Sequence, residues 1–350
     1  MSGTSISMKK ALLSMRYTIL LMAFVAVLLP GRAMATQSGL IEHIVAPSAT
    51  DPSGQIDPTL ADHYAWVNPD QTVTNGQLLV YLPGSGGVPA NALLFQQLAA
   101  QVGYHVIGLM YEDGNFLQGL CATDPDPNQC FYDAHYEIVY GIDVSDKLQV
   151  SPADSIVNLL TKFLQYLDQR YPQEGWSQFL SGSESNLHPN WSQIALSGIS
   201  QGAGNSAMIA RDHVVPRVVM FSGVTDAIPT GSTSWLLTHA TPSDRYWGLA
   251  HDQDPIYPNI TANWESLGMG EFGALVQVEY SSPPYQETHQ LFTDLKPHEG
   301  SGFTNAHPST VIDFYTPLDK GQPVLDPAWQ YLITADSKGG SESPKAGSIR

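Results

Sequence analysis

The sequence predicts an α/β fold in which helices flank a mostly parallel, doubly wound sheet, and two features of the chain predict it. First, apolar runs with strand character at residues 77–81 and 104–111 are separated by residues 90–102, whose apolar side chains recur at helical spacing. Strand, helix and strand at this distance form the βαβ unit of a parallel sheet. Second, a glycine–serine–glycine motif at residues 198–202 lies between another apolar strand run and a run of small residues that can begin a helix.

The remaining predicted elements continue this alternation after one interruption. Residues 112–150 form an aromatic-rich insertion. The following Ser151-Pro152-Ala153-Asp154 is a capping box with proline at the first helical position, which predicts a helix to about Arg170. Residues 36–76 are polar and rich in turn-forming residues, and we assign no element to them. We expect further strands at 217–223, 244–250 and 274–280, and the start of a closing helix within 307–316.

The two ends of the chain predict an exported protein with one folded domain. Basic residues, a short apolar stretch and the cleavage pattern Ala33-Met34-Ala35 are typical of a secretory signal peptide over residues 1–35. A membrane anchor is the alternative, but Pro30-Gly31 ends the apolar stretch before it is long enough to span a bilayer. We expect a domain over 36–336, a disordered tail over 337–350, and a secreted or periplasmic protein without stable membrane insertion once the signal is removed.

The chain is strongly acidic, with 33 Asp and Glu residues against 15 Lys and Arg residues and a net charge of −18. Four of the basic residues, and none of the acidic ones, lie in the predicted signal peptide. A surface of this charge repels phosphate backbones and anionic lipids. We therefore expect no nucleic acid and no anionic membrane among the partners of this protein.

The only two cysteines, Cys121 and Cys130, flank a loop rich in Asp, Pro and Asn. In an exported chain, such a close pair predicts a disulfide-closed loop, with two free thiols as the alternative. The spacing does not match a zinc site, and no pair of histidines accompanies it. We expect the disulfide to lie within the insertion.

The pentapeptide Gly198-Ile199-Ser200-Gln201-Gly202 is the candidate catalytic motif. A serine on a sharp turn from strand to helix projects its hydroxyl away from the backbone, and flanking glycines permit the turn. The helix that follows directs the partial positive charge of its N-terminus towards a developing oxyanion. A turn serine in a glycine-rich loop is the alternative, but the strand before the motif and the helix after it favour Ser200 as a nucleophile.

A nucleophilic serine needs a base, and the base needs a carboxylate that orients it. In a doubly wound sheet these partners lie on loops after later strands. Asp254 follows the predicted strand at 244–250 within His251-Asp252-Gln253-Asp254, and we prefer it to Asp252 because it lies further from the strand end. A solvated turn and a metal site are the alternatives for this segment, but no second cluster of ligands accompanies it.

Three late histidines are candidates for the base. His307 comes after the last predicted strand and just before the predicted closing helix, where a loop histidine can lie over the serine. His298 has charged neighbours, which favours a solvated position, and His289 lies in a polar run. We therefore predict His307 as the base, which gives the chain order Ser200, Asp254, His307.

An oxyanion needs two backbone N–H donors, and the sequence offers candidates for both. One is Gln201, directly after the nucleophile. The other is expected in the glycine loop after the strand at 77–81, where we name Ser85, with Gly86 as the alternative. A phosphate-binding loop is the competing interpretation, but the loop lacks both nucleotide-binding signatures. We expect no cofactor and no metal ion.

The serine motif, the glycine loop, Asp254 and His307 occur in the order found in the α/β-hydrolase superfamily. Over roughly residues 77–320, the chain resembles a secreted, esterase- or lipase-like branch of that superfamily. It departs from many members at Leu82-Pro83-Gly84, where those members carry His-Gly. The resemblance implies an α/β-hydrolase fold and cofactor-free hydrolysis of esters, amides or related acyl bonds.

The combined interpretation is a serine hydrolase that cleaves carboxylic esters of small molecules or polymers through an acyl-enzyme. The stretch from 223 to 244 is too short for a large cap domain, and the insertion at 112–150 is the alternative cover for the site. Its aromatic residues predict an apolar or aromatic acyl group, or else they are core. An amidase or peptidase using the same residues, or a non-catalytic binding protein on the same fold, remain the other hypotheses.

Overall fold

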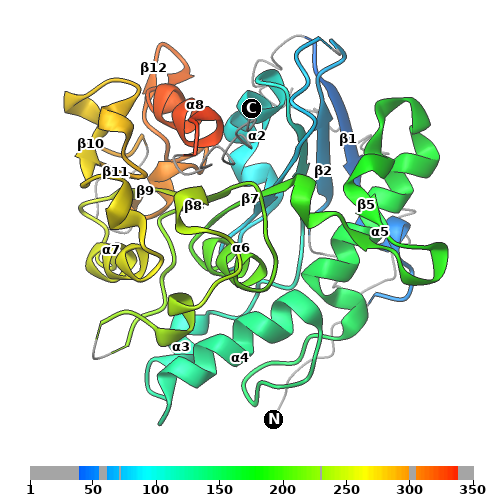
Figure 1. Cartoon of the computed structure of the whole chain (residues 1–350), viewed down its shortest axis with the longest axis horizontal. Coiled ribbons are helices and arrows are strands. Elements are labelled where there is room, and N and C mark those ends of the chain that lie inside the picture. The colour runs from blue at the N-terminus through cyan, green and yellow to red at the C-terminus, as the bar shows by residue number, and fades with distance from the viewer. Residues whose placement is uncertain (1–38, 55–60, 71, 229–230, 299–304, 338–350) are drawn as a thin grey trace, which may run out of the picture. The chain divides into compact units, whose positions relative to one another are not determined.

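A nine-stranded, mostly parallel sheet lies at the centre of residues 39–54, 61–70, 72–228, 231–298 and 305–337, the part of the chain that the computed structural model describes (Figure 1). The strands lie in the order β1-β2-β4-β3-β7-β8-β9-β11-β10. β2 pairs antiparallel with β1 and β4, and the other neighbouring pairs are parallel. The strands are β1 Ile41–Val45, β2 His63–Val67, β3 Leu78–Leu82, β4 His105–Gly108, β7 Ile194–Ile199, β8 Val218–Phe221, β9 Tyr246–His251, β10 Val276–Gln277 and β11 Gln290–Thr293.

Helices cover both faces of this sheet, because the strands are apolar on both faces. In β3, Leu78 and Val80 belong to the hydrophobic core beneath α4, α5 and α6, whereas Leu79 and Tyr81 belong to the core beneath α2 and α8. This arrangement confirms the predicted α/β fold with a mostly parallel sheet between helices. The helices are α1 Pro47–Thr50, α2 Leu93–Gln101, α3 Leu117–Cys121, α4 Pro127–Tyr140, α5 Ile156–Arg170, α6 Gln201–Asp212, α7 Tyr257–Ser266 and α8 Asp326–Thr334.

The chain changes direction across the sheet between β3 and β7. From β3 it continues through α2 to β4 on one side, and it later enters β7 on the other side of β3. Ligands of open α/β sheets bind at such a switch point, beyond the carboxyl ends of the strands. The glycine loop after β3 and Ser200 after β7 both lie at this position.

The predicted element boundaries are wrong in three places. The strand expected at 274–280 is only Val276–Gln277, an edge strand, and the last internal strand is β11, which its buried polar residues concealed. The helix expected within 307–316 is a single 3₁₀ turn, Pro308–Thr310, because Val311 leaves helical backbone angles, and α8 closes the fold instead. The capping box at Ser151 begins only a 3₁₀ turn, and α5 starts after a second cap at Ser155.

Residues 36–76, to which no element was assigned, contribute β1 and β2 to the edge of the sheet. The predicted signal peptide at 1–35 lies outside the described residues, as does the predicted tail beyond Ser337. No helix among the residues described is both long and apolar enough to cross a membrane.

The insertion at 112–150 contains α3 and α4, joined by the predicted disulfide. Cys121 and Cys130 are bonded, with their Cα atoms 5.5 Å apart, which confirms the pairing. Phe131 is fully buried in the core beneath α4, so this aromatic residue is structural, whereas Phe116 ahead of α3 is 63% exposed. α4 therefore packs on the face of the sheet beside α6 (Figure 1).

Replacing both Cys121 and Cys130 by serine should lower the free energy of unfolding by about 2–3 kcal/mol, because the disulfide restricts the unfolded chain. Denaturant unfolding of the oxidised wild type and the double variant measures the difference. Gln129→Ser, on the same helix, is the matched control and should remain near the wild type. Equal unfolding midpoints for wild type and double variant would contradict the prediction.

Candidate active site

Ser200 occupies a strained turn between β7 and α6, as predicted for a nucleophile. Its backbone angles are φ 56° and ψ −121°, a combination that non-glycine residues rarely adopt. The residue is half-buried, at the N-terminus of a 12-residue helix. The first N–H groups of that helix have no partner within the helix, and they carry partial positive charge next to the serine.

The glycines of the motif are required by close contacts between backbones. A Cβ atom added to Gly198 would lie 2.5 Å from the carbonyl group of Gly202, and one added to Gly202 would lie 2.2 Å from the carbonyl oxygen of Leu82. Gly84 is similarly close, since a Cβ there would lie 3.1 Å from Cβ of Ser200. The turn after β7 therefore packs directly against the segment that follows β3.

Asp254 and His307 meet across the site from two different loops. His307 donates from Nδ1 to Oδ2 of Asp254 at 2.5 Å. The Asp254 side chain is only 2% exposed, whereas the His307 side chain is 25% exposed. With its proton on Nδ1, a neutral imidazole leaves Nε2 as a free acceptor, which is the form that a general base needs.

The structure brings Asp254, and not Asp252, to His307. Asp254 lies at the end of a turn in which its N–H donates to the carbonyl of His251 at 3.0 Å, and this turn directs its carboxylate inward. The carboxylate of Asp252 instead accepts from the Gln253 side chain at 2.9 Å. Nδ1 of His251 accepts from the N–H of Gln253 at 3.1 Å, and Nε2 donates to the carbonyl of Leu295 at 2.9 Å. Both nitrogens of this imidazole are therefore occupied by backbone contacts that stabilise the turn.

The other two candidate histidines lie apart from this pair. His289 is fully buried, stacks on Trp247 and Phe272, and contacts the carbonyl of Tyr246 with Nδ1 at 3.0 Å. His298 is exposed. Although His289 lies in a polar run of the sequence, its ring is sandwiched between aromatic side chains in the core.

The glycine loop after β3 comprises residues 83–88. The N–H of Gly86 donates to the carbonyl of Asp113 at 3.0 Å, which removes the alternative donor. Among the described residues, no acceptor is hydrogen-bonded to the N–H of Ser85 or of Gln201. The Ser85 hydroxyl donates to Oε1 of Gln201 at 2.5 Å, so the two predicted donor residues lie side by side.

Two hydrogen bonds to residues that follow β4 hold this glycine loop. Tyr111 donates its hydroxyl to the carbonyl of Pro83 at 2.7 Å, and Asp113 accepts from Gly86 as described. Asp113 itself is buried, which together with the nearby Glu112 carboxylate raises its pKa to about 7. The loop is therefore held by groups that the sequence alone did not single out.

Ser200 and His307 are not joined in this structure. Neither Oγ of Ser200 nor Nε2 of His307 makes a hydrogen bond with a described residue, although the two residues border the same turn after β8. Catalytic hydrogen bonds are often long in unliganded enzymes and tighten when substrate binds. The arrangement can support nucleophilic attack once the imidazole and the hydroxyl approach.

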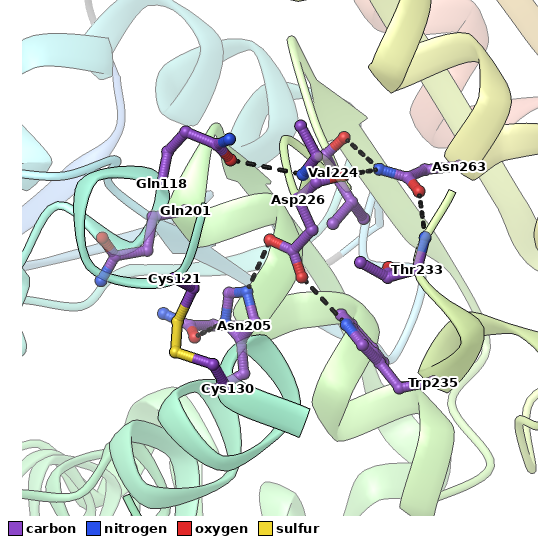
Figure 2. Close-up of polar contacts among 12 residues, drawn as sticks. Gln118, Cys121, Cys130, Gln201, Asn205, Val224, Asp226, Thr233, Trp235 and Asn263 are labelled. Carbon is purple, nitrogen blue, oxygen red and sulfur yellow. Dashed lines mark hydrogen bonds and ion pairs between the residues drawn. A yellow bond between two sulfur atoms is a disulfide. The ribbon is translucent and has the colours of Figure 1, made fainter. Parts of the chain in front are cut away.

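A second polar cluster lies between α4, α6 and the loop after β8, and its central residue is His135 of α4. The imidazole contacts Oδ1 of Asn205 with Nδ1 at 2.7 Å and Oδ1 of Asp226 with Nε2 at 3.2 Å. Trp235 donates from Nε1 to the other oxygen of Asp226 at 2.9 Å, as Figure 2 shows. Both ring nitrogens of His135 face acceptors, so the imidazolium is the form that satisfies both.

Asn263 and Gln118 extend this cluster to the loop after β8. Asn263 donates to the carbonyls of Val224 and Asp226 at 3.0 and 2.9 Å and accepts from the N–H of Thr233 (Figure 2). Gln118 of α3 accepts from the N–H of Ala227 at 3.3 Å. The disulfide-bonded insertion is thus attached to the loop after β8 and to α6.

Burial alone would lower the pKa of His135, but the charge of Asp226 and the hydrogen bonds to Asp226 and Asn205 outweigh it and raise the pKa. This cluster could not be predicted from local patterns, because His135 is separated from Asn205 by 70 residues and from Asp226 by 91. In the structure, a Cβ added to Gly204 would lie 2.4 Å from the His135 ring, so only glycine leaves room for the imidazole.

A cavity of about 720 Å³ lies away from the candidate active site, between Leu98, Trp247 and Tyr331. Trp247 is the second residue of β9, whereas Asp254 follows the last residue of that strand. The cavity therefore lies at the opposite end of β9 from His307.

No group of three or more His, Cys, Asp and Glu side chains in the described part of the chain is placed to hold a metal ion. No protein-family model matches the sequence, and no curated protein matches it.

The raised pKa of His135 should make the folded state less stable as the pH rises. Its stabilising effect is complete below the unfolded pKa of about 6.5 and is lost as the pH rises through the higher folded value. The free energy of unfolding, measured from pH 6 to 9, should therefore fall less steeply in His135→Gln than in the wild type. His63→Gln is the matched control, since burial lowers the pKa of His63 to about 3, and its slope above pH 7 should equal that of the wild type.

Proposed function

We propose that this chain is a serine hydrolase that cleaves carboxylic ester bonds of a small-molecule or polymer substrate. The observation that supports this most strongly lies at the carboxyl ends of β7 and β9. There, a strained, half-buried Ser200 lies close to the Asp254–His307 pair. A serine hydroxyl needs an oriented imidazole to become a nucleophile, and an imidazole needs a buried carboxylate to hold its tautomer. The resemblance to the α/β-hydrolase superfamily adds to this proposal.

In the proposed reaction, Ser200 Oγ attacks the ester carbonyl while Nε2 of His307 takes the hydroxyl proton. Asp254 stabilises the resulting imidazolium through the bond to Nδ1. The tetrahedral oxyanion accepts hydrogen bonds from the N–H groups of Ser85 and Gln201, and removing one such donor typically costs about 3 kcal/mol of transition-state stabilisation. His307 then gives its proton to the departing alcohol, and the acyl group remains on Ser200.

Water completes the proposed cycle. His307 removes a proton from the water as it attacks the acyl-enzyme, and the proton returns to Ser200 Oγ when the carboxylic acid leaves. An amide substrate would use the same residues and would differ in the protonation of its leaving amine. We propose export from the cytoplasm as well, which the disulfide between Cys121 and Cys130 supports, because disulfides persist in oxidising compartments.

Ser200→Ala should abolish both labelling by a fluorophosphonate probe and hydrolysis of p-nitrophenyl esters, because the attacking oxygen is lost. A panel of p-nitrophenyl esters of rising chain length identifies the preferred acyl group in the wild type. Ser192→Ala, at an exposed serine away from the site, is the matched control and should keep wild-type labelling. Labelling that persists in Ser200→Ala would overturn the assignment, and a wild type that neither labels nor hydrolyses esters or amides would favour a binding protein.

Asp254→Asn should reduce kcat by about 10⁴-fold, because an amide at this position favours the wrong tautomer of His307. Asp252→Asn is the matched control and should stay near the wild type, since its carboxylate contacts Gln253 rather than His307. Steady-state kinetics with the best ester of the panel measures both. A crippled Asp252→Asn beside a nearly normal Asp254→Asn would reverse the assignment.

A further inference from the structure

Ser222, directly after β8, combines full burial with a backbone conformation that disfavours side chains. Its φ is 42°, in the left-handed region, and it is 0% exposed. Glycine adopts such angles without steric cost, whereas a serine there is strained. A side chain at this position therefore costs conformational free energy.

The hydroxyl of Ser222 holds the backbone of His307. It donates to the carbonyl oxygen of His307 at 2.7 Å, and it lies 3.0 Å from Oγ1 of Thr310. A hydroxyl has one proton to donate, so the bond to His307 leaves the Thr310 hydroxyl to donate to Ser222. Thr310 is fixed in turn, since its carbonyl accepts from Nε1 of Trp329 at 2.8 Å.

The same turn also contacts the nucleophile. Ser200 donates its N–H to the carbonyl of Phe221 at 3.0 Å, and a Cβ added to Gly223 would lie 2.9 Å from the carbonyl oxygen of Ser200. The N–H of Ser222 donates to the carbonyl of Leu249 at 2.9 Å, within the strand whose loop carries Asp254. One buried residue thus lies at the junction of the three segments that carry the proposed triad.

We propose that Ser222 is a positioning residue that sets the distance of the His307 imidazole from Ser200. Asp254 holds the ring at Nδ1, which leaves the ring free to pivot about that contact unless the backbone is also fixed. The bond from Ser222 to the His307 carbonyl supplies that second point of attachment. This inference rests on the proposed hydrolase function, because it concerns the step in which Nε2 approaches Oγ.

Ser222→Gly is the decisive variant, because it removes the hydroxyl and at the same time relieves the backbone strain. We expect kcat for the best p-nitrophenyl ester to fall by about 10- to 100-fold with KM unchanged, since a shift of about 1 Å in a catalytic group can cost 10²-fold. Ser222→Ala should show the same split between kcat and KM and is the second variant if Ser222→Gly folds poorly. Thr310→Val leaves the bond to His307 in place and should lose far less kcat.

A readout that does not depend on turnover separates this inference from the proposed function. The proton NMR resonance of the His307 Nδ1–H, which is bonded to Asp254, should shift or broaden in Ser222→Gly and remain in place in Thr310→Val. A Ser222→Gly protein with wild-type kcat and an unmoved resonance would overturn the positioning role while the hydrolase function stands. A wild type without probe labelling and without hydrolysis would overturn the function and this role together.

Discussion

The close approach of backbones around Ser200 is the constraint on which the rest of the site depends. An added Cβ would lie 2.5 Å from Gly202 if placed on Gly198, 2.2 Å from Leu82 if placed on Gly202, and 2.9 Å from Ser200 if placed on Gly223. The turn from β7 to α6 can form only where these side chains are missing, and forming it forces Ser200 to a positive φ. Because the ends of β3, β7 and β8 meet there, the loops after these strands have little freedom relative to the serine.

Helix α6 connects the turn at Ser200 to the interior of the fold. Its residues 201–210 are all buried, and Gly204 leaves room for the imidazole of His135 from α4. That imidazole holds Asp226 in the loop after β8, so the helix that presents Ser200 is connected to the loop that follows the neighbouring strand. The His135–Asp226 pair joins α4 to the loop after β8, and the bond between His135 and Asn205 joins α4 to α6.

Local patterns predicted the parts of the fold that local interactions determine. The βαβ unit, the turn at Ser200 and the disulfide each depend on residues close together in sequence, and the structure contains all three. β11 was missed because Gln290 and Thr293 are polar although buried, and burial of polar residues depends on distant partners. The contact between His307 and Asp254 likewise depends on residues distant in sequence. Loop position favoured Asp254, but the turn in which the Asp254 N–H bonds to the His251 carbonyl determines which carboxylate points inward.

The buried titratable groups change the stability of the fold in opposite directions as the pH changes. Burial raises the pKa of Asp113 and of Asp313 to about 7, and it lowers the pKa of His63 to about 3. The two carboxyl groups, like His135, bind more protons in the folded state and weaken the fold as the pH rises, whereas His63 weakens it as the pH falls below about 6.5. Above that pH His63 is neutral in both states, so the remaining groups act in one direction and stability declines through about pH 7. The glycine loop after β3 is bonded to the backbone carbonyl of Asp113, whereas the carboxylate of Asp313 itself accepts from the first N–H groups of α2, which follows that loop. Ionisation of Asp313 in this range therefore acts on the start of α2, directly after the loop that carries the proposed Ser85 donor.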